Sequence, residues 1–131
     1  MIVVDASALF EVLLNTEAAP DVATRLFDAR ETLHAPHLID VEIAQVLRRY
    51  TLSGELEPAR GEEVLADLTD FPLTRYPHAL FLQRIWDLRR NATAYDAAYL
   101  VLAEALGATL VTCDRALASI PGHSARVEVL C

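Results

Sequence analysis

The chain begins with a short apolar stretch that leads directly into residues with helical spacing: Ile2-Val3-Val4-Asp5-Ala6-Ser7-Ala8-Leu9-Phe10. Three consecutive β-branched residues are typical of a buried strand. Beyond Asp5 the apolar residues recur as they do on one face of a helix, at Leu9, Phe10, Leu13 and Leu14. A strand that leads at once into a helix is the opening unit of an α/β fold.

The same alternation continues along the rest of the chain. The predicted strands are Ile2–Val4, Thr32–Ala35, Leu73–Tyr76, Thr109–Cys113 and Arg126–Leu130. The predicted helices are Ser7–Leu14, Pro20–Ala29, Leu38–Leu52, Pro58–Asp70, His78–Arg90, Ala94–Leu106 and Arg115–Ile120. The helix at 94–106 is apolar on nearly all sides, so we expect it in the interior. This pattern predicts an α/β fold with a mainly parallel sheet, and the lack of repeats or linkers predicts a single domain over residues 1–131.

The composition excludes several classes of protein. With 131 residues and 53% hydrophobic residues, the chain can bury a full core and is not a disordered protein. Its apolar runs are too short for a membrane span, and an acid at Asp5 argues against a signal peptide. The formal net charge is −8, from 19 acids against 11 bases that are all arginine. An acidic protein repels phosphate at long range, which by itself argues against nucleic acid as a partner.

Cysteine and histidine residues carry little functional signal. Cys113 and Cys131 make neither a disulfide framework nor a zinc site, and we expect two reduced thiols in a cytoplasmic protein. Cys113 is expected to be a buried strand residue without chemistry. The four histidines are scattered, and we expect them at the surface or in turns: His34, His37, His78 and His123.

Four acids interrupt apolar surroundings at places that an α/β fold brings together. Asp5 and Asp114 follow predicted strands, and Asp96 lies at the start of the interior helix. Glu42 shares its helix face with Gln45 and Arg49. Since sites in parallel α/β sheets form beyond the carboxyl ends of the strands, these four side chains are expected to converge.

Each acid also has a purely structural interpretation. Asp5 and Asp114 are suited to cap the helices that follow them, and Thr93 with Asp96 resembles a capping box. Glu42 is compatible with a solvated position at the edge of its helix. Against this, carboxylates among apolar neighbours are costly unless they are paired or bound to a metal, and the chain has no lysine.

Converging carboxylates favour a hard divalent cation. Ligands that are all oxygen suit Mg²⁺ or Mn²⁺, and such sites serve mainly phosphate chemistry. Half of the excess negative charge would then belong to the site, and bound cations would neutralise it. The net charge then argues less strongly against nucleic acid as a partner.

The segments that carry these acids resemble the PIN domain, and most closely the VapC toxins of bacterial toxin–antitoxin pairs. The matching stretches are Val3–Leu9, Leu38–Arg49 with Glu42, Leu88–Glu104 with Asp96, and Leu110–Leu117 with Asp114. The resemblance implies a three-layer α/β/α sandwich around a central, mainly parallel sheet of four to five strands. It also implies an endoribonuclease that depends on Mg²⁺ or Mn²⁺ and hydrolyses RNA with water.

The resemblance assigns roles to individual residues. The family's acidic metal ligands and catalytic residues correspond to Asp5, Glu42, Asp96 and Asp114. Thr112 matches a hydroxyl position near the metal, and Ser7 is placed to hydrogen-bond to the site. Some members carry a further acid where this chain has Ala116, so the second of one or two ions would be held weakly.

The resemblance also implies partners. It predicts an RNA substrate, a cognate VapB-type antitoxin that covers the acidic pocket, and a homodimer or a toxin–antitoxin hetero-oligomer. DNA would be bound only through the antitoxin, and no membrane is involved.

Arginines and aromatic residues near the acidic segments allow two interpretations. Arg49, Arg89 and Arg90 are candidates for RNA phosphate contacts, because arginine suits bidentate binding of phosphate. Solvated helix ends would also explain them. The aromatic and large apolar residues in these segments are expected to pack in the core or in a dimer: Phe81, Leu82, Trp86, Tyr95 and Tyr99.

Other function classes fit less well. A PIN-fold module that mainly binds its antitoxin and regulates its operator, with little nuclease activity, is the alternative. A phosphoacceptor receiver domain is excluded because the chain has no lysine. The turn at Asp5–Ser7 lacks the glycines of a dinucleotide site, and Ser7 stands where an Asp-x-Asp phosphatase has its second acid.

Overall fold

A single parallel sheet of five strands forms the centre of the molecule. The computed structural model describes all residues, 1–131. The strands are β1 (Ile2–Val4), β2 (Leu33–Pro36), β3 (Leu73–Tyr76), β4 (Thr109–Thr112) and β5 (Arg126–Val129). They lie in the order β3-β2-β1-β4-β5, and every neighbouring pair is parallel. The prediction of a mainly parallel sheet is confirmed.

Seven α-helices and one 3₁₀ turn connect the strands. They are α1 (Ala6–Leu13), α2 (Ala19–Leu26), α3 (Leu38–Leu52), α4 (Pro58–Asp70), the 3₁₀ turn η1 (Ala79–Phe81), α5 (Leu82–Asp87), α6 (Ala94–Leu106) and α7 (Arg115–Ala118). Most ends agree with the predicted ends to within a few residues. The predicted helix at 78–90 is wrong, since it divides into η1 and a short α5. Beyond Asp87 the backbone continues with tight turns in which Arg89 bonds to Trp86 and Asn91 to Leu88.

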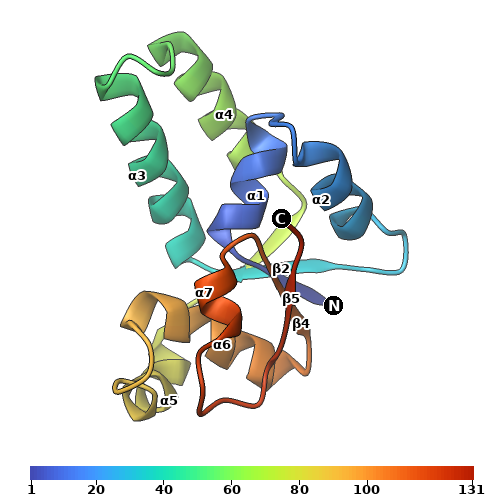
Figure 1. The fold of residues 1–131 in the computed structure, drawn as a ribbon, viewed down its shortest axis with the longest axis vertical. Coiled ribbons are helices and arrows are strands. Elements are labelled where there is room, and N and C mark those ends of the chain that lie inside the picture. The colour runs from blue at the N-terminus through green and yellow to red at the C-terminus, as the bar shows by residue number, and fades with distance from the viewer.

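The connections place helices on both faces of the sheet (Figure 1). From β1 the chain proceeds outward through β2 and β3 by way of α1 to α4, and then returns to the other side of β1 for β4 and β5. Right-handed crossovers in opposite directions put the two sets of helices on opposite faces, which gives the expected three-layer α/β/α sandwich. The direction of winding changes between β1 and β4, and ligand sites form at such a switch point.

Helix α6 is largely buried, as the sequence predicts. Its seven central residues, 97–103, are all buried, and it packs across β1, β2 and β4. The hydroxyl of Thr93 accepts a hydrogen bond from the backbone of Asp96 at one end of the helix. Gly107 closes the other end with a φ of 61°, a left-handed conformation that favours glycine. Both ends of α6 are therefore determined by local residues.

Two expectations about single residues are wrong. Cys113 and Cys131 form a disulfide, because they lie just beyond the paired ends of the neighbouring strands β4 and β5. His34 is buried in β2, where its ring nitrogens lie 2.7 Å from the hydroxyls of Thr32 and Tyr76. No helix of the structure is long and apolar enough to cross a membrane.

We predict that the interior position of α6 dominates stability. Leu100 is 0% exposed, so Leu100→Ala should lower the free energy of unfolding by about 2–5 kcal/mol through lost burial and a residual cavity. Urea unfolding followed by circular dichroism measures this. Leu80→Ala is the matched control, because Leu80 is 84% exposed and its truncation should change stability by no more than about 0.5 kcal/mol. Equal effects of the two variants would contradict the central role of α6.

Candidate active site

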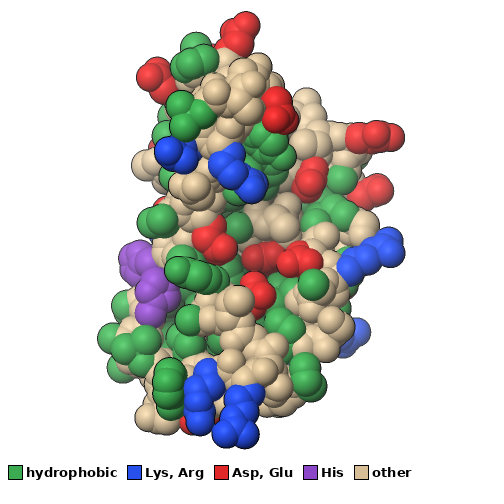
Figure 2. All heavy atoms as spheres, turned by 60° about the vertical axis from the view of Figure 1, so that its left-hand side comes forward, with side chains coloured by type: hydrophobic (Ala, Val, Ile, Leu, Met, Phe, Trp, Pro, Cys, Tyr) green, Lys and Arg blue, Asp and Glu red, His purple; other side chains and the backbone are tan.

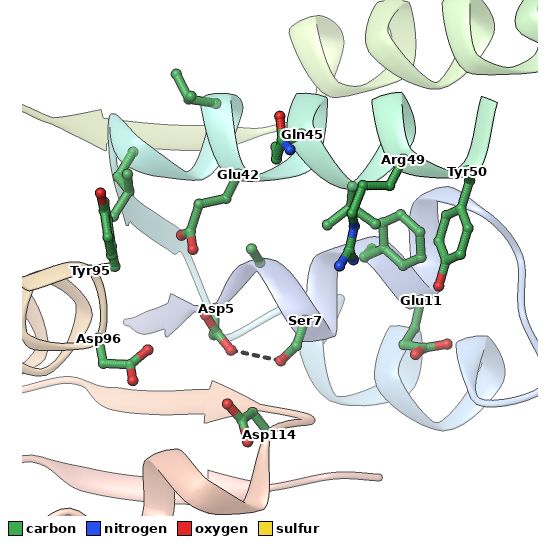
Figure 3. A pocket seen from close by; sticks show the side chains of 15 residues that line it. Asp5, Ser7, Glu11, Glu42, Gln45, Arg49, Tyr50, Tyr95, Asp96 and Asp114 are labelled. Atoms are coloured by element: carbon green, nitrogen blue, oxygen red, sulfur yellow. Dashed lines mark hydrogen bonds between the residues drawn. The ribbon is translucent and has the colours of Figure 1, made fainter. Parts of the chain in front are cut away.

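All four predicted acids line one cavity. It has a volume of about 680 Å³ and opens at the carboxyl ends of β1 and β4, between α1, α3 and the start of α6. Asp5 follows β1, Glu42 projects from α3, Asp96 lies in the first turn of α6, and Asp114 follows β4. Figure 3 shows their carboxylates directed toward a common space. The structure therefore brings together acids from four separate segments of the chain.

Asp5 is held by two hydroxyl groups. Its side chain is buried, and its Oδ2 accepts hydrogen bonds from Ser7 Oγ at 2.6 Å and from Thr112 Oγ1 at 2.7 Å. The hydrogen bonds leave Oδ1 without a partner in the protein. Both donors are neutral, so the negative charge of the carboxylate is oriented but not cancelled.

The same hydroxyls connect β1 to the loop after β4. Ser7 Oγ accepts from the backbone N–H of Cys113 at 3.0 Å, and Thr112 Oγ1 accepts from that of Asp114 at 2.9 Å. Ser7 and Thr112 therefore lie beside the acids, as expected. Through these contacts the backbone of Asp114 is fixed relative to the carboxylate of Asp5.

Glu42 has a partner that sequence reasoning missed. The hydroxyl of Tyr99 donates to Glu42 Oε1 at 2.6 Å, and Tyr99 itself is buried in α6. The expectation that Tyr99 only packs is wrong. A signal was present in the sequence, because a tyrosine hydroxyl inside an apolar helix must find an acceptor in the interior.

Asp114 and Asp5 differ in whether their side chains cap the helix that follows. Asp114 is exposed and accepts from the backbone N–H of Ala116 at 2.9 Å, so it also caps α7 as its structural interpretation predicts. The side chain of Asp5 makes no such capping bond to α1. The structural interpretation is thus correct for Asp114 and wrong for Asp5.

Mutual repulsion couples the four acids. Burial raises the pKa of Glu42, the hydrogen bond from Tyr99 opposes this rise, and the charges of Asp5 and Asp96 add to it. Burial also raises the pKa of Asp96, and the charges of Asp5 and Asp114 raise it further. Each acid of the group thus influences at least one other. The cavity concentrates negative charge, and none of the four acids forms a salt bridge.

The cavity offers only oxygen donors near the acids, which is the donor set that hard divalent cations prefer. As they stand, no three of the acidic, histidine or cysteine side chains are close enough together to form a ready coordination shell. Their chemistry fits such a cation, and the carboxylates would have to come closer together to surround it.

The three arginines predicted to bind RNA lie in two different parts of the structure. Arg49 lines the cavity, whereas Arg89 and Arg90 are exposed in the turn between α5 and α6 and do not line it. None of the three forms a salt bridge. The arginines that do pair with acids are Arg25, Arg30, Arg60, Arg75 and Arg84. In Figure 2 basic side chains lie above and below the acidic centre of one face.

Several aromatic residues are more exposed than expected. Trp86 is 61% exposed, and the Arg89 guanidinium lies 4.7 Å from the centre of its ring. Tyr95 is 63% exposed and lines the cavity. Leu82 is also exposed. For these three residues the core interpretation is wrong within a single chain.

Comparisons with known proteins identify the family of the chain. The PIN domain family model matches residues 2–122. Ribonuclease VapC12 of Mycobacterium tuberculosis is 41% identical over 130 residues, which is 99% of this chain and 99% of that protein. Ribonuclease VapC9 of the same species is 47% identical over 114 residues, covering 87% of this chain and 86% of that protein.

A solved structure supports the fold. VapBC2 from Rickettsia felis, bound to a DNA fragment from its promoter, has a TM-score of 0.73 at 16% identity and covers 98% of both chains. The family match and the two ribonucleases extend over most or all of the chain. The chain belongs to the PIN-domain family and, within it, to the VapC group.

Proposed function

We propose that this protein is the toxin of a toxin–antitoxin pair, an endoribonuclease that uses Mg²⁺ or Mn²⁺. The observation that carries the proposal is the convergence of Asp5, Glu42, Asp96 and Asp114 in one cavity, where no salt bridge neutralises them. Similarity to two named ribonucleases over most of their length supports it. We treat residues 1–131 as one PIN domain.

The four acids would hold one or two cations. A divalent cation bound there would stabilise the charge that develops on a phosphoryl group and make water a better nucleophile. Ser7 and Thr112 keep one oxygen of Asp5 turned away and the other free, and Tyr99 does the same for Glu42. Because water attacks rather than the ribose 2′-hydroxyl, the products would carry a 5′-phosphate and a 3′-hydroxyl.

The acidic cavity also suits an inhibitor. A VapB-type antitoxin could place an arginine against the carboxylates, since paired acids bind guanidinium groups well. We propose that this complex, as a hetero-oligomer or around a toxin homodimer, reaches operator DNA only through the antitoxin. We propose a cytoplasmic location, because that is where the proposed RNA substrate is found.

We predict that removal of one acid abolishes cleavage. Asp5→Asn or Asp96→Asn should lower the rate of Mg²⁺-dependent RNA cleavage at least about 100-fold, because each removes a charge that holds the cation. The assay uses purified protein, and 5′-phosphate ends are mapped by sequencing. Asp67→Asn, exposed on α4, is the control and should cleave normally.

Two results would contradict this assignment. Full activity of both acid variants would exclude the proposed site. A wild-type protein that binds its antitoxin but cleaves no RNA with Mg²⁺ or Mn²⁺ would favour the alternative of a binding module.

We also predict a characteristic dependence of stability on pH. Glu42 and Asp96 have raised pKa values when folded, so the folded chain keeps their protons to higher pH than the unfolded chain. The contribution of these two acids to the stability of the metal-free protein should therefore fall as pH rises from about 4 through their raised pKa values. Urea unfolding in EDTA measures the effect, and Asp96→Asn should reduce it.

Binding of the cation should reverse the loss at neutral pH. Mg²⁺ at about 100 times its dissociation constant should stabilise the wild-type protein by about 2.7 kcal/mol at pH 7, because it binds only the folded state. Asp96→Asn should respond much less. An equal response of the two proteins would show that Mg²⁺ binds elsewhere.

The unpaired arginines are predicted to bind RNA phosphates. Arg89→Ala and Arg90→Ala should each weaken RNA binding and reduce the slope of log K against log salt by about 0.7 to 1. Binding is measured in the Asp5→Asn background so that RNA is not cleaved. Arg30→Ala is the control, because Arg30 is exposed but already paired with Asp28. If all three changes lower the slope equally, the turn between α5 and α6 has no special role.

A further inference from the structure

The four converging acids occupy only one end of the cavity. The other end lies between α1 and α3, where Phe10, Val46 and Tyr50 form an apolar wall and Gln45 and Arg49 border it. Figure 3 shows Arg49 pointing from α3 toward α1, with Tyr50 and Glu11 beyond it and the acids on its other side. One continuous space therefore joins two regions of different chemistry.

The spacing of residues on both helices creates this second region. On α3 the residues Glu42, Val46 and Tyr50 follow one another at four-residue steps, with Gln45 and Arg49 beside them. On α1 Phe10 follows Ser7 by three residues. Residues three and four apart lie on the same face of a helix. The faces that carry the acid end thus continue directly into the aromatic end.

The wall of this end is aromatic and partly open. The ring centres of Phe10 and Tyr50 lie 5.8 Å apart with their planes tilted by 33°. Both residues are half-buried, so their rings pack on each other and still face the cavity. Such a surface can accept another flat ring by stacking.

Polar groups around the rings are free. The side-chain amide of Gln45, the hydroxyl of Tyr50 and the guanidinium of Arg49 make no hydrogen bond or salt bridge to other residues of the chain. Glu11 lines the same cavity but is engaged by the hydroxyl of Thr16. An apolar pocket with a few free polar groups is the usual form of a site for an organic ligand.

We propose that this end is a subsite for a nucleobase of single-stranded RNA, one that belongs to a nucleotide directly next to the scissile phosphate. The inference rests on the proposed ribonuclease function and adds the element that selects sequence. The base stacks on Phe10 and Tyr50, and the side-chain amide of Gln45 hydrogen-bonds to its edge. Arg49, between the two ends, meets the phosphate that links this nucleotide to the cleaved bond.

A nucleobase fits this region better than a purely apolar ligand. Proteins recognise single-stranded RNA by stacking splayed bases on aromatic side chains and by hydrogen bonds to the base edges. The region also borders the acids, so a nucleotide there would be continuous with a phosphate at the acidic end. The guanidinium of Arg49 has no acidic partner and can contact the phosphate of such a nucleotide directly.

The test is a double-mutant cycle between protein and RNA. A cleaved RNA is prepared with one abasic nucleotide at each position near the cut in turn. For the wild-type protein, one position directly beside the cut should lower kcat/KM by about 5- to 150-fold, which is the usual value of one stacked base. For Tyr50→Leu the intact RNA should be cleaved more slowly by a similar factor. The abasic nucleotide at that position should then lower kcat/KM of this variant only slightly further.

Two further variants distinguish loss of the subsite from a general loss of folded structure. Gln45→Ala removes an exposed side chain without core contacts and should change which base is preferred at the same position. Phe27→Leu is the matched control, because Phe27 forms a similar tilted pair with Phe71 far from the cavity. It should retain the full abasic penalty.

The outcomes separate this inference from the proposed function. If the wild-type protein cleaves RNA but Tyr50→Leu keeps the full abasic penalty, the subsite is refuted and the nuclease assignment stands. The subsite is equally refuted if Tyr50→Leu and Gln45→Ala weaken only antitoxin binding. If the wild-type protein cleaves no RNA at all, the proposed function itself fails.

Discussion

Repulsion among four carboxylates is the constraint on which the rest of this structure depends. Asp5, Glu42, Asp96 and Asp114 share a cavity in a chain that has no lysine. The fold orients Asp5 and Glu42 with neutral hydroxyl donors, from Ser7, Thr112 and Tyr99. A paired arginine would have been more stabilising but would have cancelled the charge. Neutral donors fix the geometry and leave the negative potential available for a cation.

Such an arrangement requires rigid support. Asp5 extends from β1, the central strand, whose three residues are fully buried, and Tyr99 lies within the buried part of α6. Both elements belong to the main hydrophobic core. Burial, and after it mutual repulsion, raises the pKa values of Glu42 and Asp96, and the best-packed part of the molecule opposes this cost. In both β1 and α6, well-packed apolar residues thus stand directly beside the groups that form or support the acidic site.

Local patterns in the sequence predicted the features that depend on neighbours along the chain. Helix α6 carries its own capping residues and an apolar surface, so its bounds and interior position follow from the sequence. The β-branched residues of β1 likewise predicted a buried central strand. The position of the acids at the carboxyl ends of strands followed from these two elements and from the topology of parallel sheets.

Features that depend on distant residues could not be predicted in this way. The Cys113–Cys131 bridge requires the register of β4 with β5, and the burial of His34 requires Tyr76 on the neighbouring β3. The partner of Tyr99 lies 57 positions away on α3. Trp86 is exposed because the packed side of α5 is formed by Ile85 and Leu88 instead. In each case the pairing partner, and not the local pattern, decides the outcome.

The distribution of arginines resolves the apparent conflict between an acidic chain and an RNA substrate. Five arginines are paired with acids away from the cavity, whereas Arg49, Arg89 and Arg90 have no acidic partner. A net charge of −8 would still slow the long-range approach of RNA. Over short distances, however, a phosphate in the proposed site would meet unpaired guanidinium groups and a cation held by the acids. Affinity in such a protein has to come from local contacts, and therefore its sequence preference depends on the shape and chemistry of the groove beside the acids.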